Sequence, residues 1–107
     1  MQAGTMVLAY LHTPKERIWG VLREQDASGI WLEGLDLLSF DDWARQVARE
    51  EPATICPSLV FYPMLRIEKL VVDRSSPGQP SQADRFEQMV GMRVEEHLDL
   101  EPSGRRD

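Results

Sequence analysis

Residues 17–37 read RIWGVLREQDASGIWLEGLDL and carry the clearest strand pattern of the chain. On both sides of Asp26–Gly29 the side chains alternate between two sets, and a period of two residues is typical of a β-strand. The segment Asp26-Ala27-Ser28-Gly29 is rich in turn residues. The stretch therefore predicts two β-strands joined by a tight turn.

Each of these two strands carries a glycine near its middle, Gly20 in the first and Gly34 in the second. A glycine inside a strand costs stability unless the strand bends there or another backbone comes close. Two such positions predict sharply curved strands, as in a small barrel whose single sheet folds over itself.

Three further strands are expected outside this stretch. Met6–Leu11 reads as a short buried strand, and the apolar run Leu59–Tyr62 predicts a strand that is covered on both faces. Pro63 has no N–H to donate, so the chain must bend there or lie at a sheet edge before a strand resumes over 65–72. The fold class is therefore mainly β, a strongly bent five-stranded barrel with two short helices.

The period changes after Ser39, which forms a capping-box-like start with Asp42. Apolar residues follow at helical spacing and predict an amphipathic helix over 39–51, before Pro52. We expect its Phe40 and Trp43 to pack in the core. The alternative is that they form an exposed stripe that binds a partner.

A second helix is expected to begin at Ser81 and Asp84, with Phe86, Met89, Val90 and Val94 on one face and Gly91 weakening its middle. The chain then divides into three parts. These are a barrel over 1–74 with the helical insertion 39–51, a linker and C-terminal helix over 75–98, and a disordered tail over 99–107.

Composition limits the function classes. A chain of 107 residues fits one domain, and its net charge of −6 repels a phosphate backbone unless its few basic residues gather on one surface. The only cysteine, Cys56, lies in an apolar stretch and predicts a buried structural thiol. The N-terminal stretch lacks the features of a signal peptide or a membrane span, so we expect a cytoplasmic protein.

Motifs for catalysis are absent from the sequence. His12 and His97 have no partner at a metal-ligand spacing, and neither a glycine-rich phosphate loop nor a Gly-x-Ser-x-Gly setting occurs. We expect a non-enzymatic protein without metal or cofactor. Carboxylate-only active sites leave no such motif, so an enzyme stays open as an alternative.

Two blocks of the chain resemble the Sm-like (Lsm/Hfq) family. Gly20-Val21-Leu22, the turn at 26–29 and the run 30–37 with Gly34 are similar to the first Sm-like motif, and Ser39-Phe40-Asp41 is similar to a Ser-Phe-Asp of Hfq. The segment 61–67 falls where the family carries its second motif. The resemblance covers 17–73 and implies an Sm-like or SH3-like barrel that assembles into rings through its strand edges.

The chain also departs from that family. Tyr62, Pro63 and Met64 stand where Hfq has a Tyr-Lys-His stretch that contributes to a uridine-rich RNA site, and the Arg-Gly of other Sm proteins is missing. A strand replaces the usual N-terminal helix, and the helix 39–51 separates the two motifs. A second resemblance is to an uncharacterised bacterial family with an FxPxxRxE pattern, matched here by Phe61, Pro63, Arg66 and Glu68.

These observations lead to two hypotheses. The first is a self-assembling binding or scaffolding module that forms a ring, as the resemblance implies, and whose helix 39–51 docks a protein partner. Its expected subunit interface comprises the apolar residues Leu59, Val60, Phe61, Leu65, Ile67 and Leu70.

The second hypothesis is Hfq/Lsm-like binding of single-stranded RNA, with aromatic residues stacking on bases and basic residues meeting phosphates. The expected RNA or partner contacts are Lys15, Arg17, Trp19, Trp31, Tyr62, Arg66 and Lys69. For Trp19 and Trp31, packing inside the barrel or at an interface is the alternative.

Overall fold

The computed structural model describes residues 1–98, so the predicted disordered tail, 99–107, lies outside the described residues. Within these residues, five strands, three α-helices and two short 3₁₀ helices follow one another. Their bounds are β1 (Met6–Leu11), β2 (Glu16–Asp26), β3 (Gly29–Asp36), η1 (Leu37–Ser39), α1 (Phe40–Ala48), β4 (Ser58–Pro63), η2 (Met64–Arg66), β5 (Ile67–Val72), α2 (Gln82–Val90) and α3 (Val94–His97).

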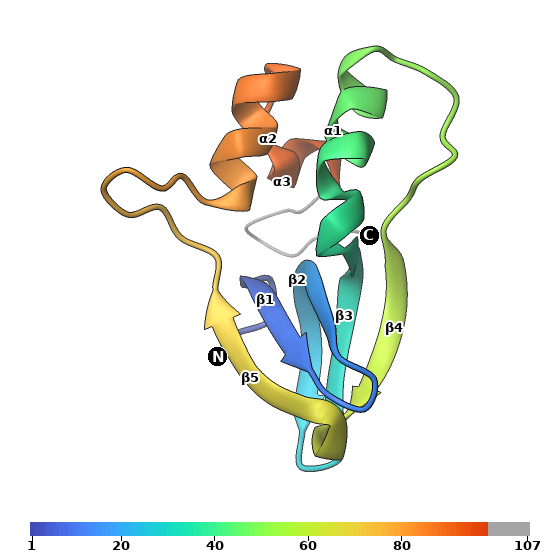
Figure 1. Cartoon of the computed structure of the whole chain (residues 1–107), viewed down its shortest axis with the longest axis vertical. Coiled ribbons are helices and arrows are strands. Elements are labelled where there is room, and N and C mark those ends of the chain that lie inside the picture. Colours follow the sequence, from blue (N-terminus) through green and yellow to red (C-terminus); the bar gives the residue numbers. More distant parts are fainter. Residues whose placement is uncertain (99–107) are drawn as a thin grey trace.

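All five strands belong to one antiparallel sheet in the order β4-β3-β2-β1-β5. The prediction of a mainly β chain with five strands is therefore confirmed. The predicted closure into a barrel is not seen, because β4 and β5 remain the two edges of the sheet. Figure 1 shows these edge strands on opposite sides of the molecule, converging where η2 joins them.

The two mid-strand glycines lie directly opposite each other, Gly20 on β2 and Gly34 on β3. A Cβ atom placed on Gly34 would come within 2.0 Å of the Trp19 carbonyl oxygen, and one on Gly20 within 3.0 Å of the Glu33 carbonyl oxygen. Only glycine permits this approach of the two backbones. Of the two reasons for a mid-strand glycine, a bend or a close backbone, the structure shows the close backbone.

The two faces of the sheet have separate cores. The inner face carries a cluster of seven buried aliphatic residues from β1, β2 and β3, with Tyr62, Ile67 and Leu70 packed against it. The outer face presents Trp19 and Leu35 to the helices, where Phe40, Trp43, Ala44, Phe86 and Val94 complete a second buried cluster. The prediction that Phe40 and Trp43 pack in the core is confirmed.

The helices form a layer over one end of the sheet (Figure 1). Trp43 of α1 contacts Trp19 and Phe86, with ring centroids 6.0 and 4.9 Å apart. Arg85 of α2 and Asp41 of α1 form an ion pair of 2.7 Å whose geometry is not that of an aligned hydrogen bond. The C-terminal helix predicted for 75–98 thus shares a core with the insertion between β3 and β4.

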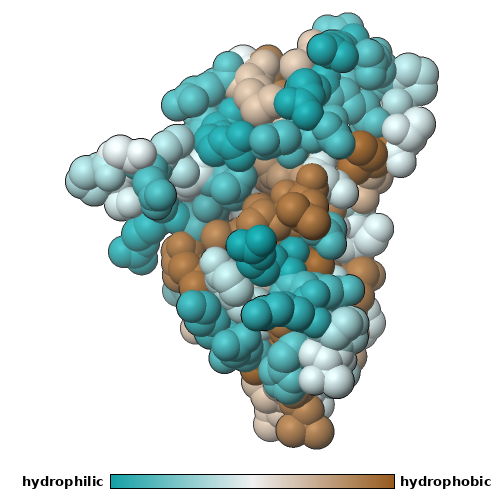
Figure 2. All heavy atoms as spheres, in the orientation of Figure 1, coloured by the Kyte–Doolittle hydropathy of each residue, from teal (hydrophilic) through white to brown (hydrophobic). Residues whose placement is uncertain are grey.

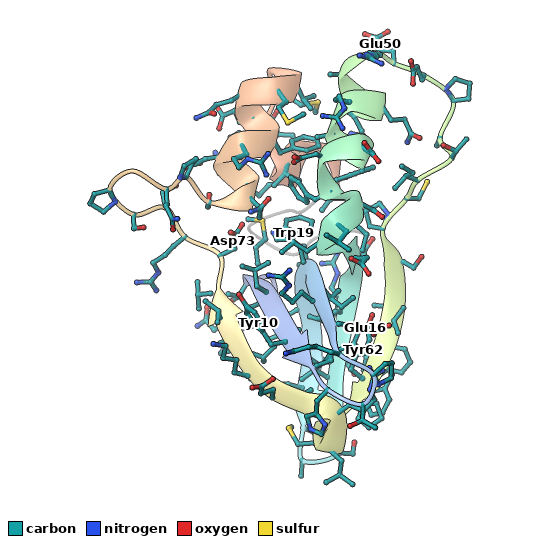
Figure 3. The ribbon with its side chains drawn as sticks, in the orientation of Figure 1. Tyr10, Glu16, Trp19, Glu50, Tyr62 and Asp73 are labelled. Atoms are coloured by element: carbon teal, nitrogen blue, oxygen red, sulfur yellow. The ribbon has the colours of Figure 1, made fainter. Side chains whose placement is uncertain are left out.

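Asp73 fastens this helical layer to the sheet. Its carboxylate accepts hydrogen bonds from the buried Trp19 Nε1 at 3.0 Å and from the backbone N–H groups of Gln82 and Ala83 at 2.9 and 3.0 Å. Figure 3 shows Trp19 and Asp73 together below the helices. A negative charge at a helix N-terminus is favourable, so one side chain both caps α2 and satisfies the indole.

Two details of the predicted helices are wrong. Ser39 makes no side-chain cap, and the residue that caps this region is Asp36, whose carboxylate accepts from Leu38 N at 2.9 Å at the start of η1. Gly91 does not lie inside a helix: its φ of +90° ends α2, and Val94 belongs to the separate α3. A left-handed residue after a helix is the ordinary position for glycine.

Two burial predictions are also wrong. The run Leu59–Tyr62 is not covered on both faces, because β4 is an edge strand and its residues are largely exposed. Cys56 is exposed rather than buried, in the loop that Gln46 ties down through Thr54 and Ile55. Within residues 1–98, none of the helices has the length and apolar character needed to cross a membrane.

Candidate functional site

The most distinctive surface of the molecule is the free edge of β4. Its six residues read SLVFYP and contain no charged side chain. Leu59 is 57% exposed, and Val60 and Phe61 are exposed as well. Figure 2 shows hydrophobic surface on the side of the molecule where β4 runs and at the lower tip, at η2. Free edges of soluble proteins usually carry charges or a bulge against pairing, and within β4 neither is present.

An aromatic pair extends this apolar edge onto the outer face of the sheet. Trp31 on β3 lies opposite Phe61 on β4, with ring centroids 5.4 Å apart. The Phe61 ring also lies over Gly29, where an added Cβ would meet it at 2.7 Å. Trp31 is 40% exposed, so the pair is held in place and still offers apolar surface.

The other predicted interface residues lie around η2 and β5. Leu65 of η2 is 89% exposed at the connection between the two edge strands. Ile67 and Leu70 point inward, half-buried against the inner-face cluster. On the exposed side of β5, Val71 adds a further apolar residue. The six predicted interface residues thus divide into four surface residues and two that pack in the core.

Tyr62, Glu16 and Arg66 meet where η2 approaches the start of β2. Arg66 forms an ion pair with Glu16 at 3.3 Å and donates to the carbonyl oxygens of His12 and Pro14. Burial raises the pKa of Tyr62, and the negative charge of Glu16 adds to the increase while Arg66 opposes it. Arg66 therefore serves to hold the β1–β2 turn against η2.

A cavity of about 540 Å³ opens on the outer face of the sheet beside η1. Its lining combines apolar and charged residues: Tyr10, Leu11, Lys15, Glu16, Arg17, Asp36, Leu38, Glu68 and Lys69. Tyr10 lies opposite Arg17 on β2 and opposite Lys69 on β5, so the three side chains form one row across the sheet. Lys69 Nζ lies 4.7 Å from the centre of the Tyr10 ring.

The seven predicted RNA or partner contacts do not form one surface. Lys15, Arg17 and Lys69 share the cavity, Arg66 and Tyr62 belong to the η2 cluster, and Trp31 lies at the β4 side. Trp19 is completely buried and offers no face for stacking on a base, in agreement with the packing alternative.

Of the residues that line the cavity, only Lys15, Arg17 and Lys69 are among the contacts predicted from the sequence; Tyr10 and Leu38 are among those that sequence reasoning missed. Tyr10 lies in an apolar strand, and only the register that places it between Arg17 and Lys69 reveals its surroundings. Leu38, 84% exposed, follows the Asp36 cap that turns the chain out of β3.

Among residues 1–98 there is no group of three or more His, Cys, Asp or Glu side chains placed to hold a metal ion. Comparison with known proteins adds no relative: no protein-family model, curated protein or solved structure matches the chain.

Proposed function

We propose that this protein is a self-associating binding or scaffolding module with an Sm-like small-barrel core, and that its β4 edge pairs with a strand edge of another copy. The observation that carries the proposal is the uncharged, exposed six-residue edge of β4. Its outward backbone N–H and C=O groups gain partners when a strand is added there.

A second copy is the partner that best fits this edge. The same chain offers a second free edge, β5, of the same length of six residues. Contact between these edges on successive copies is a head-to-tail arrangement, which leaves no free edge if the assembly closes. The apolar residues still exposed on β4 would each add on the order of 1 kcal/mol on burial.

Two features of the sheet support an Sm-like barrel core. The backbones of β2 and β3 approach closely at Gly20 and Gly34, and the two edge strands of the sheet are joined by only the short helix η2. In such an assembly a strand of the neighbouring copy would pair with each free edge of the open sheet. We do not extend the proposal to single-stranded RNA, because the residues expected for it are divided among three regions and Trp19 is buried.

The test is the molar mass in solution by light scattering, compared between the wild-type protein and Leu59→Lys. A lysine on a free edge opposes strand pairing, and position 59 is exposed enough to accept it without loss of folding. Gln88→Lys adds the same charge on the exposed side of α2 and is the matched control.

We expect a multiple of the chain mass for the wild-type protein and for Gln88→Lys at low and high salt, and a monomer for Leu59→Lys. A wild-type monomer at every concentration would refute the proposal. An oligomer that Leu59→Lys leaves intact would place the contact elsewhere.

A further inference from the structure

Most of the charged residues that line the cavity beside η1 have no ion-pair partner in the described part of the chain. Of its three carboxylates, Glu16 is paired with Arg66, whereas Asp36, which accepts the Leu38 N–H, and Glu68 have no ion-pair partner among residues 1–98. None of its three cations, Lys15, Arg17 and Lys69, has an ion-pair partner within residues 1–98. Three unpaired cations against two unpaired carboxylates leave one positive charge on balance.

The cations are also placed for a common target. Arg17 and Lys69 flank Tyr10 from the two neighbouring strands, so their Cβ atoms lie two strand spacings, about 10 Å, apart, a distance that two long side chains can span toward a common ligand. Lys69 is kept near this row by its position over the Tyr10 ring. An oxyanion between Arg17 and Lys69 could accept hydrogen bonds from both, and the planar guanidinium suits two oxygens of one carboxylate or phosphate.

The part of the cavity lining that is not charged is largely apolar. Leu11 forms part of its lining from the buried core, Tyr10 adds an aromatic ring, and the exposed Leu38 of η1 completes the apolar part. These surfaces suit a ligand with an apolar body behind its charged group. The volume of about 540 Å³ lies in the range of small-molecule sites.

We infer that this cavity is a binding site for a small amphipathic anion, a single carboxylate or phosphate group on an apolar body. The anionic group lies between Arg17 and Lys69 with Lys15 nearby, and the body lies against Tyr10 and Leu38. Every residue of the site comes from one chain, so the inference does not depend on self-association.

The test uses three probes that share a phenyl body: benzoate, phenyl phosphate and the uncharged benzyl alcohol. Each is titrated into the isotope-labelled full chain, and binding is followed by amide chemical shifts in nuclear magnetic resonance. We expect saturable shifts at Tyr10, Arg17 and Lys69 with at least one anion, and no saturation with benzyl alcohol. Preference for benzoate or for phenyl phosphate identifies which oxyanion the site takes.

Three variants are expected to weaken binding, to strengthen it and to leave it unchanged. Arg17→Gln should weaken binding about tenfold or more, because a hydrogen-bonded charge is lost. Glu68→Gln should strengthen binding several-fold, because it removes an unpaired carboxylate from the lining of the cavity. Arg74→Gln, an exposed arginine outside the cavity, should change nothing.

Several results would overturn the inference. They are the absence of saturation with both anions, equal binding of benzyl alcohol, and equal losses from Arg17→Gln and Arg74→Gln. A single-stranded oligonucleotide that shifts these same amides, with an affinity rising with its length while the small anions fail, would replace the small-molecule site by a nucleic-acid surface.

Discussion

Two aromatic groups on the same face of one sheet differ in how far they are buried. Trp19 is completely buried beneath Phe40, Trp43 and Phe86, whereas the Trp31–Phe61 pair remains partly exposed. The alternation of β3 places Leu35, the partner of Trp19, and Trp31 on the same side of the sheet. The difference arises because residues of the three helices pack over Trp19, whereas they do not cover Trp31 and Phe61 at the β4 side.

The fold buries the region around Trp19 completely with side chains of the same chain. The region around Trp31 has the same kind of side chain beside a free strand edge, which is the composition of an interface. The predictions that follow test this division.

The largest effect is expected from Trp19→Ala, which removes a buried indole and leaves a cavity between sheet and helices. The free energy of unfolding should fall by about 3–5 kcal/mol, a large share of the stability of a small domain. Trp31→Ala, the same change at the bare region, should lower it by about 1 kcal/mol or less. Chemical denaturation monitored by circular dichroism measures both, and equal losses would remove the distinction between the two regions.

The next effect concerns the fastening of the helical cover. Asp73→Ala removes the acceptor of the Trp19 indole and of two α2 backbone N–H groups, and should cost about 2 kcal/mol in the free energy of unfolding. Glu87→Ala, on the exposed side of α2, should stay within about 0.5 kcal/mol. If the two variants unfold at the same denaturant concentration, Asp73 does not hold the cover.

The ranking of the two tryptophans should reverse when self-association is measured. Trp31→Ala deletes apolar surface next to the β4 edge and should raise the dissociation constant about tenfold, since aromatic residues contribute strongly at interfaces. Sedimentation at a series of concentrations gives this constant, with Gln88→Lys as an exposed control. An unchanged constant would exclude Trp31 from the interface.

The smallest effect is a dependence on high pH at the η2 cluster. Because the pKa of Tyr62 is raised above its ordinary value of 10.0 in the folded chain, the unfolded chain loses this proton first. The stability from Tyr62 is thus complete below pH 10 and declines as the pH rises toward the folded pKa. Tyr62→Phe should flatten this decline in denaturation experiments above pH 10, and an identical slope in both proteins would contradict the assignment.

Much of the sheet could be predicted because its signals are local. The alternation over 17–37, the turn at 26–29 and the two mid-strand glycines each act within a few residues, and the register pairs Gly20 with Gly34. Pro63 likewise marked the end of β4, where η2 begins. The helix starting at Ser81 was recognisable because Ser81 Oγ accepts from Asp84 N in the ordinary capping arrangement.

The errors arose where the decisive partner is distant or absent from the local pattern. An apolar run such as Leu59–Tyr62 has the same composition in a central strand and at an uncovered edge, and only the sheet order separates them. The role of Asp73 depends on Trp19, 54 residues away in sequence. The cavity could not be predicted for the same reason, since its row of Lys69, Tyr10 and Arg17 exists only through the register of three strands.

The most direct measurement is backbone amide hydrogen exchange along the chain as a function of protein concentration. If β4 pairs with another copy, its amides and those of the receiving edge should become more protected as concentration rises, while the amides of the 76–80 loop stay unchanged. Leu59→Lys should abolish the concentration dependence. Exchange along β4 that is rapid and identical at every concentration would contradict edge pairing and leave β4 as an ordinary solvent-exposed edge.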